Sequence, residues 1–152
     1  MSKNRDALKF FQNFIREMID IGGQNLPKSI SASLGAKLGK LLKERGGSGI
    51  ENSLKKIYNA VNAKTKIKSI GDNILEITLK HSKKFCPIGG KVNPERAEVI
   101  QNTICIPYTV AILNSLDSEL KYNVEIQNCI LKSNNRFCQY RLTLEEKKSS
   151  SS

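Results

Sequence analysis

Several residue types that mark common classes of protein are scarce in this 152-residue chain. It contains one histidine, His81, no tryptophan, and 14 acidic residues against 25 lysines and arginines. General acid–base catalysis draws on histidine and carboxylate side chains, and no carboxylate near His81 in the sequence is well placed to orient its ring. Nicotinamide and flavin motifs are absent as well. We therefore do not expect autonomous enzyme activity.

Long apolar runs are also lacking. No stretch approaches the roughly 20 apolar residues that cross a bilayer, and residues 1–20 lack the continuous apolar segment of a signal peptide. We therefore expect a cytoplasmic protein. With 39% hydrophobic residues, the chain suits one compact domain, residues 1–146, followed by a disordered Lys/Ser tail at residues 147–152.

The excess of basic residues gives the chain a formal net charge of +11. The lysines are scattered over the polar faces of the expected helices and strands, which favours a solvated, lysine-rich surface. A functional contact of this surface with an anionic membrane or an acidic partner is the second interpretation. We do not expect sequence-specific binding of nucleic acid.

The spacing of apolar residues predicts both helices and strands. Helical spacing marks four segments, at residues 4–21, 27–44, 54–61 and 94–116. Alternating apolar residues mark two hairpins, at residues 65–80 and 120–144, with turns at 71–73 and 133–135. Pro107 falls inside the fourth helical segment, where we expect a kink or a break.

Small residues recur along the second helical segment. Ser31, Gly35 and Gly39 follow one another at four-residue spacing, which lets another backbone approach closely at some cost in helix propensity. Packing against another helix of the same chain is the first interpretation. A dimer face and the wall of a ligand channel stay open as alternatives.

Four cysteines lie in the second half of the chain, each in a different local pattern. Cys86 opens a Cys-Pro-Ile-Gly-Gly loop, and Cys105 lies in an apolar segment. Cys129 and Cys138 occupy the two arms of the last hairpin. In a cytoplasmic protein such thiols bind metals, change redox state or are simply buried. Cys105 is the best candidate for a merely buried thiol, and Cys86 is the poorest.

The register of the last hairpin decides whether Cys129 and Cys138 face each other. A loop centred between Ser133 and Asn134 places them directly opposite, with Cβ atoms about 4.5–5.5 Å apart. A loop centred between Asn134 and Asn135 makes them diagonal, and both registers stay open. No Cys-x-x-Cys pair is present, so a metal site would have to be assembled by the tertiary structure. With zinc as the candidate metal, its candidate ligands are Cys86, Cys105, Cys129, Cys138 and His81.

Several segments together resemble a known family. These are the helix 33–39 and the segments Phe85–Gly90, Ile104–Tyr108, Tyr122–Cys129 and Phe137–Leu142. In this order and spacing they resemble the 4-vinyl-reductase (4VR) domain family, a small-molecule-binding module of archaea and bacteria. The name of that family is not taken as evidence for reductase activity.

The resemblance implies an α+β fold, with N-terminal helices packed on one face of a twisted antiparallel sheet. It implies a sensor or carrier of small hydrophobic ligands or metals, in which the four cysteines bind metal or sense redox state and Glu125 is an orienting partner. The same fold occurs in core subunits of the TRAPP vesicle-tethering complex, where a buried channel accepts an acyl chain. The alternative function is therefore a TRAPP-like structural subunit that forms a homodimer and contacts membranes or acidic partners.

Overall fold

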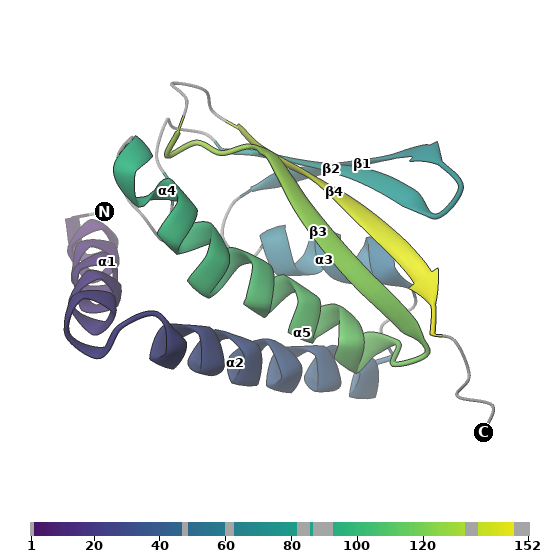
Figure 1. The fold of residues 1–152 in the computed structure, drawn as a ribbon, viewed down its shortest axis with the longest axis horizontal. Helices are drawn as coiled ribbons and strands as arrows, with labels where there is room; N and C mark the ends of the chain where they lie inside the picture. Colours follow the sequence, from purple (N-terminus) through teal and green to yellow (C-terminus); the bar gives the residue numbers. More distant parts are fainter. Residues whose placement is uncertain are drawn as a thin grey trace.

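The chain folds into helices and a single sheet, and this α+β arrangement confirms the expected fold class. The structure is a computed structural model that describes residues 2–46, 49–59, 63–81, 86, 93–132 and 137–147. Apart from the N-terminal helix, its helices lie beneath one face of a four-stranded antiparallel sheet (Figure 1). The turn expected at 133–135 lies outside the described residues, as does the expected tail apart from Lys147.

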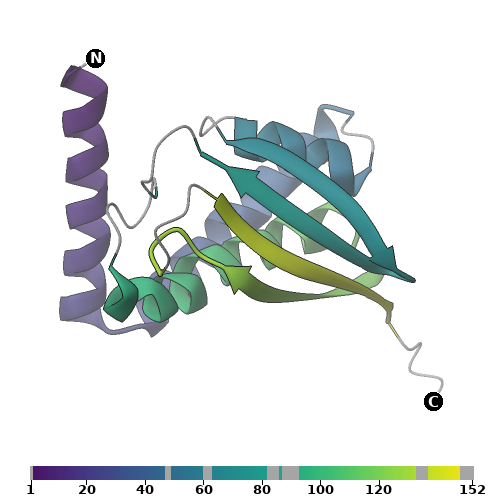
Figure 2. The ribbon, with the colours of Figure 1, turned by 90° about the horizontal axis from the view of Figure 1, so that it is seen from above.

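Three helices open the chain close to the positions that the apolar spacing predicts. α1 spans Ser2–Gly22, α2 spans Asn25–Glu44 and α3 spans Ile50–Asn59. Gly23 follows α1 with a φ of +74°, a left-handed conformation that glycine adopts without steric cost and that ends the helix. The chain therefore turns sharply into α2. α1 stands at one end of the molecule and does not cover the sheet (Figure 2).

Two hairpins build the sheet. β1 (Lys64–Gly71) pairs with β2 (Ile74–Lys80), and β3 (Leu120–Asn128) pairs with β4 (Phe137–Glu146). The first hairpin turns at the predicted position, where Asn73 adopts the left-handed conformation that such a tight turn favours. β2 also pairs with β4, so the strand order is β1-β2-β4-β3.

The helical segment at residues 94–116 does not break at Pro107. It runs as α4 (Pro94–Ile100), a π-helical segment η1 (Gln101–Cys105) and α5 (Ile106–Leu116). The N–H of Ile106 bonds back to the carbonyl of Gln101, five residues earlier, so the helix is locally wider. Pro107 follows this wide turn and stands in the first turn of α5, where its missing N–H and its ring are tolerated. The expected break is therefore absent.

This helix of 23 residues, Pro94–Leu116, is by length and composition long and apolar enough to cross a membrane, with a mean hydropathy of 1.3. The expectation that no segment approaches this length is therefore wrong for this helix. In this fold, α5 lies between α2 and the sheet, and its Ile112 and Leu113 are at most 1% exposed. Only 28% of its most apolar 18-residue stretch is buried, so the helix is not mostly enclosed by the rest of the described chain.

Two layers of helix lie beneath the sheet. α5 packs against β3 and α3 packs against β1, while α2 lies under α5 and farther from the strands (Figure 1). The core between sheet and helices is apolar, and its most deeply buried side chains include Leu54, Ile77, Leu113 and Leu142. Each buried side chain of this kind contributes about 1.5–3 kcal/mol relative to an exposed one.

One polar contact crosses this core. The hydroxyl oxygens of Tyr58 on α3 and Tyr140 on β4 lie 2.7 Å apart, and Tyr58 also shares a hydrogen bond with the hydroxyl of Thr109 on α5. Burial raises the pKa of Tyr58 to about 12 and that of Tyr140 well above its ordinary value. Both hydroxyls therefore stay protonated and join two helices to the sheet.

The small residues of α2 face α5. Ser31, Gly35 and Gly39 are all buried. A Cβ atom on Gly39 would lie 2.5 Å from the carbonyl oxygen of Ile112, and one on Gly35 would collide with the carbonyl oxygen of Tyr108. The stripe thus lets two backbones of the same chain touch, which confirms the intramolecular interpretation over the dimer face and the channel wall.

Candidate thiol site

All four cysteines lie in or against one apolar cluster at one end of the molecule. Cys86 and Cys129 are buried within it, and Cys105 and Cys138 are half-buried and pack against it. We call these four residues the thiol cluster, and all four carry reduced thiols. The other buried members of this apolar cluster come from α1, α4 and the turn after β3: Ile15, Ile19, Ala97, Ile100, Ile130 and Leu131.

A β-bulge sets the register that brings Cys129 to Cys138. Ile126 pairs with Tyr140, but Asn128, two residues on, pairs with Gln139, so β3 carries one extra residue at this point. The extra residue turns every later side chain of β3 to the other face. Continued by one position, the shifted register puts Cys129 opposite Cys138. The pairing of β3 with β4 ends at Asn128 and Gln139, and the register there runs toward the directly opposed arrangement rather than the diagonal one.

The sulfur of Cys129 accepts hydrogen bonds from several donors. The Cys138 thiol has the largest effect, followed by the side chain of Gln101 and the backbone N–H groups of Leu131 and Lys132, the last of which also donates to the carbonyl oxygen of Cys129 at 3.0 Å. These bonds favour the thiolate and outweigh burial, which opposes it. They lower the pKa of Cys129 from 9.0 to about 6. Cys129 is therefore the member of the thiol cluster that ionises most readily near neutral pH.

The neighbouring thiols are held in the protonated form. The hydrogen bond that Cys138 donates to Cys129 raises the pKa of Cys138 far above its ordinary value, and burial adds to this effect. Burial also raises the pKa of Cys105, with smaller contributions from Cys86 and Cys129. The backbone N–H of Ile130 donates to the sulfur of Cys138 at 3.4 Å. The cluster thus combines one acidic thiol with neutral neighbours.

Cys86 links the cluster to α1. The side-chain amide of Gln12 on α1 donates a hydrogen bond to the carbonyl oxygen of Cys86, with 3.3 Å between Nε2 and O. Cys86 is 8% exposed, so it is buried as well, although the sequence made it the poorest candidate for a merely buried thiol. The residues that flank Cys86, including the rest of its Pro-Ile-Gly-Gly sequence, lie outside the described part of the chain.

The predicted metal ligands are not gathered as a ligand set. Within the described ranges, no three His, Cys, Asp or Glu side chains are placed to hold a metal ion. His81 follows β2, and partial burial lowers its pKa, which favours the neutral ring. Glu125 is exposed opposite Arg141, because the alternation along β3 turns it away from the core face. The zinc site stays a prediction, and the described side chains do not fit it as they stand.

Gln101 is a site residue that the sequence reasoning missed. It opens η1, four residues before Cys105, and this spacing puts both residues on the same side of the helix, toward the end of the hairpin. π-helical turns inside α-helices are frequent at functional sites. The sequence feature that could have identified this residue is the polar pair Gln101-Asn102, which stands just ahead of an apolar run that contains a proline.

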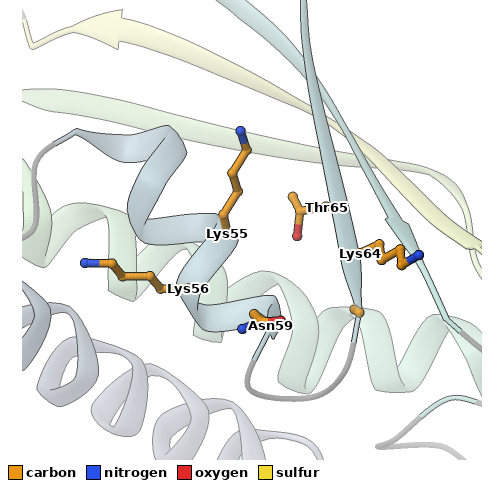
Figure 3. A pocket seen from close by; sticks show the side chains of 6 residues that line it. Lys55, Lys56, Asn59, Lys64 and Thr65 are labelled. Carbon is orange, nitrogen blue, oxygen red and sulfur yellow. The ribbon is translucent and has the colours of Figure 1, made fainter.

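A hollow of about 590 Å³ lies between the end of α3 and the start of β1, away from the thiol cluster. Its lining includes Lys55, Lys56, Lys64 and Thr65, whose buried hydroxyl oxygen has no hydrogen-bond partner among the described residues. The three lysine side chains point in different directions (Figure 3). The hollow therefore attracts anions in general, but its ammonium groups do not converge on one bound group.

No family model matches the sequence, and no curated protein matches it. Two solved structures share its fold. The trafficking protein particle complex subunit 3 from Naegleria fowleri, solved covalently bound to palmitic acid, has a TM-score of 0.58 at 9% identity, covering 92% of this chain and 93% of that chain. The phenol-responsive sensory domain of the transcription activator PoxR, solved with phenol, also has a TM-score of 0.58, at 12% identity, covering 90% of this chain and 73% of that chain. The chain is thus structurally similar, at low sequence identity, to a TRAPP subunit and to a ligand-binding sensory domain.

Proposed function

We propose that this chain is a small-molecule-binding module, a sensor or carrier that holds an apolar ligand beside the thiol cluster. The observation that carries the proposal is the meeting of four thiols, from separate segments, at one apolar cluster. Aliphatic side chains alone would suffice to fill an ordinary core. Four sulfur atoms add polarizable surface, and Cys129 adds a sulfur that ionises near neutral pH.

The fold supports this class of ligand. Two proteins that share it were solved with phenol and with palmitic acid, so this arrangement of helices on a sheet accommodates aromatic and acyl molecules. In this chain the apolar part of the ligand would contact Ile104 and Ile126, which pack against the cluster. Gln101 and Cys129 would supply the polar contacts.

Native mass spectrometry of the full chain, purified without chelator, tests the proposal. A bound mass that is lost on denaturation indicates a non-covalent ligand, and one that survives indicates an adduct on a thiol. Phenol and palmitic acid, added separately to ligand-free protein, are expected to raise the Tm. We expect at least one of them to do so, less strongly in Cys129→Ser and unchanged in Ile70→Ser, a matched change at an exposed residue of β1. No bound mass and no Tm shift with either probe would reject the function.

Metal analysis of the same preparation tests the zinc prediction. Zinc bound at one ion per chain and released by Cys129→Ser would support a metal-binding form of the module. Metal-free protein whose Tm is unchanged after chelation would reject the metal-binding form, and only the small-molecule form would then stand.

A second candidate function is that of an interaction subunit. It is favoured by the apolar surface of the N-terminal helices, where Phe10 is 72% and Phe14 59% exposed and their rings stack with centroids 6.5 Å apart. On α2 the exposed row is Leu26, Ile30 and Leu34. Exposed apolar side chains gathered on a helix in this way mark contacts with proteins or membranes. A homodimer formed through these helices would cover them.

Light scattering after size-exclusion chromatography tests this second function. A dimer is expected to become a monomer in Phe14→Lys and Leu34→Lys, while Ile70→Lys on the sheet stays dimeric. Anionic vesicles at low and high salt test the membrane contact, because binding through lysines weakens as salt screens charge. A monomeric protein that does not bind anionic vesicles would contradict the interaction function.

A further inference from the structure

We propose that the outer edge of β1 binds an extended acidic segment of a partner protein. The segment pairs with β1 as an additional strand and places carboxylates beside Lys64 and Lys66. This inference goes beyond both functions proposed above, because the residues that carry it lie on α3 and β1 and belong neither to the thiol cluster nor to α1 and α2.

The backbone of β1 is open to such pairing on one side. β1 stands at one end of the strand order β1-β2-β4-β3, and no described strand lies outside it (Figure 2). In an antiparallel sheet, alternate residues of an edge strand turn their N–H and C=O groups outward. The pairing of β1 with β2 is regular from Lys64 to Ser69, so these outward groups form an even row. An extended segment therefore adds main-chain hydrogen bonds along this edge.

Alternate residues of β1 carry a row of positive charge. Ile67 packs against the apolar core, so its neighbours Lys66 and Lys68 lie on the opposite face of the sheet, which no described helix covers (Figure 1). Lys64 belongs to the same row, and all three lysines are exposed. The residues of an added strand also alternate between the two faces. Acidic residues at every second position thus lie beside the lysines, whereas β1 of a second copy would bring lysine against lysine.

The fold does not neutralise the positive charge at the start of β1. Lys64 lies directly opposite Lys80 on β2, and like charges in this position repel each other. Lys66 has no acidic residue opposite it, whereas Lys68 faces Glu76. Within the described ranges, none of these lysines takes part in an ion pair. An added carboxylate is therefore most favourable beside Lys64 and Lys66.

The hollow at the end of α3 adjoins the same part of the edge. Lys64 and Thr65, whose side chains belong to opposite faces of the sheet, both line it, so it borders the edge of the strand. Lys55 and Lys56 add positive charge, and the three ammonium groups point in different directions (Figure 3). Diverging charges suit carboxylates spaced along an extended chain better than they suit one compact anion. The hollow therefore extends the acidic-segment site beyond the strand itself.

A peptide fits these features better than other polyanions do. Proteins bind single-stranded nucleic acid by stacking its bases on aromatic side chains, and neither β1 nor the described lining of the hollow contains one. An anionic bilayer attracts lysines, but it has no ladder of alternating donors and acceptors to pair with an edge strand. Only an extended peptide uses both the charges and the backbone of β1.

Peptide binding to the full chain tests the inference. The probe is a fluorescent peptide of about seven residues in which glutamate alternates with valine, and fluorescence anisotropy at low salt measures its binding. We expect it to bind at least about tenfold more tightly than a peptide of the same composition whose glutamates are consecutive. Methylating one alternate set of its backbone amides should abolish binding, and methylating the other set should not, because only one set faces β1. Equal effects of the two sets, or equal binding of the two peptides, would overturn the proposal.

Hydrogen exchange locates the bound peptide. Saturating peptide should slow exchange of the outward amides of β1 at least about tenfold and leave the amides of β3, the other edge strand, unchanged. Protection of β3 instead of β1 would contradict the site. Single-stranded DNA and anionic vesicles are added as competitors. Displacement of the peptide by either of them at a similar affinity would show that the lysines attract polyanions in general, and it would reject the peptide as the specific occupant.

A charge exchange tests the lysine row. Lys66→Glu should weaken binding of the glutamate peptide about fivefold to tenfold, and it should bind the matching lysine–valine peptide more tightly than wild type does. Lys121→Glu on β3 is the matched control, since it changes the net charge equally at an exposed position of the other edge strand. Equal losses in the two variants, or no gain with the lysine peptide, would contradict the proposal.

The same variants keep this inference separate from the proposed small-molecule function. Circular dichroism checks that each variant is folded, and hydrogen exchange of the wild-type chain decides the matter if one is not. The Tm response of Lys66→Glu to phenol and palmitic acid should equal that of wild type, because Lys66 lies outside the thiol cluster. A loss of both responses in folded Lys66→Glu would contradict a separate peptide site.

Discussion

The thiol of Cys138 donates a hydrogen bond to the sulfur of Cys129, and the two meet because β3 carries one more residue than its partner strand at this point. A regular ladder running on from the pair Ile126–Tyr140 would leave Cys129 one position away and on the outer face of the sheet. The bulge at Gln127 therefore decides that the two thiols share a face. The local irregularity of one strand is what assembles the candidate site.

Deleting Gln127 should be tolerated, because it removes the extra residue and leaves Asn128 opposite Gln139. We expect the free energy of unfolding to change by less than about 1 kcal/mol. Deleting Asn123, also exposed on β3, is the matched control. It breaks the register inside the regular ladder and should cost roughly 3–5 kcal/mol, because it displaces buried Tyr122. Urea unfolding measures both, and equal losses would contradict the role given to the bulge.

Gly35→Ala should destabilise the fold although alanine is the better helix former. The added methyl group collides with the backbone of α5 at Tyr108, so α2 and α5 must separate. We expect a loss of about 1–3 kcal/mol in the free energy of unfolding. Gly71→Ala is the control, since its Cβ meets only the side chain of Ile74, at 3.7 Å. Denaturant unfolding of the two variants provides the comparison, and a stabilised Gly35→Ala would show that the helices do not touch there.

Tyr58→Phe and Tyr140→Phe should each cost about 1–2 kcal/mol, because each change removes the hydrogen bond between the two buried hydroxyls. The double variant should cost less than the sum, because it removes both hydroxyls together. A double-mutant cycle by urea unfolding measures this coupling. Strict additivity would mean that the two hydroxyls do not interact.

The free energy of unfolding should rise between about pH 6 and pH 9. The pKa of Cys129 is lowered from 9.0 to about 6 in the folded chain, so over this interval the unfolded chain holds a proton that the folded chain has released. This stabilisation is complete above the pKa that the Cys129 thiol has in the unfolded chain. It is lost as the pH falls through the pKa that the thiol has in the folded chain. Cys105 and Cys138 have raised pKa values and act in the opposite sense, above the pKa of the unfolded thiols.

Unfolding of wild type and Cys129→Ser across this pH range measures the effect. The lowered pKa of His81 also makes stability rise with pH, at lower pH, and it contributes equally to both proteins. The difference between them therefore isolates Cys129. Parallel pH profiles would show that the folded chain does not lower the pKa of this thiol.

Periodic features of the fold could be predicted from the sequence. Helical spacing marked α1 and α2, and alternation marked the hairpin that turns before Ile74, because buried faces impose these periods on the residues themselves. The small-residue stripe at Gly35 and Gly39 also pointed to close packing. Its partner, α5, depended on the tertiary fold.

The features that build the site could not be predicted in the same way. A bulge at Gln127 and a π-helical turn after Ile100 each shift the register by one residue. Neither of them changes the spacing of apolar residues in the sequence. Gln101 reaches Cys129 only because of contacts between distant segments. The exposed position of Glu125 follows from simple alternation, which the family resemblance did not take into account.

The central claim is that the folded chain makes Cys129 the reactive thiol of the cluster. A short pulse of iodoacetamide on the reduced native chain at neutral pH, read by peptide mass spectrometry, tests it most directly. We predict that Cys129 is labelled first, ahead of Cys86, Cys105 and Cys138, and that its lead disappears in urea. Labelling of Cys129 no faster than the other three in the native chain would contradict the account.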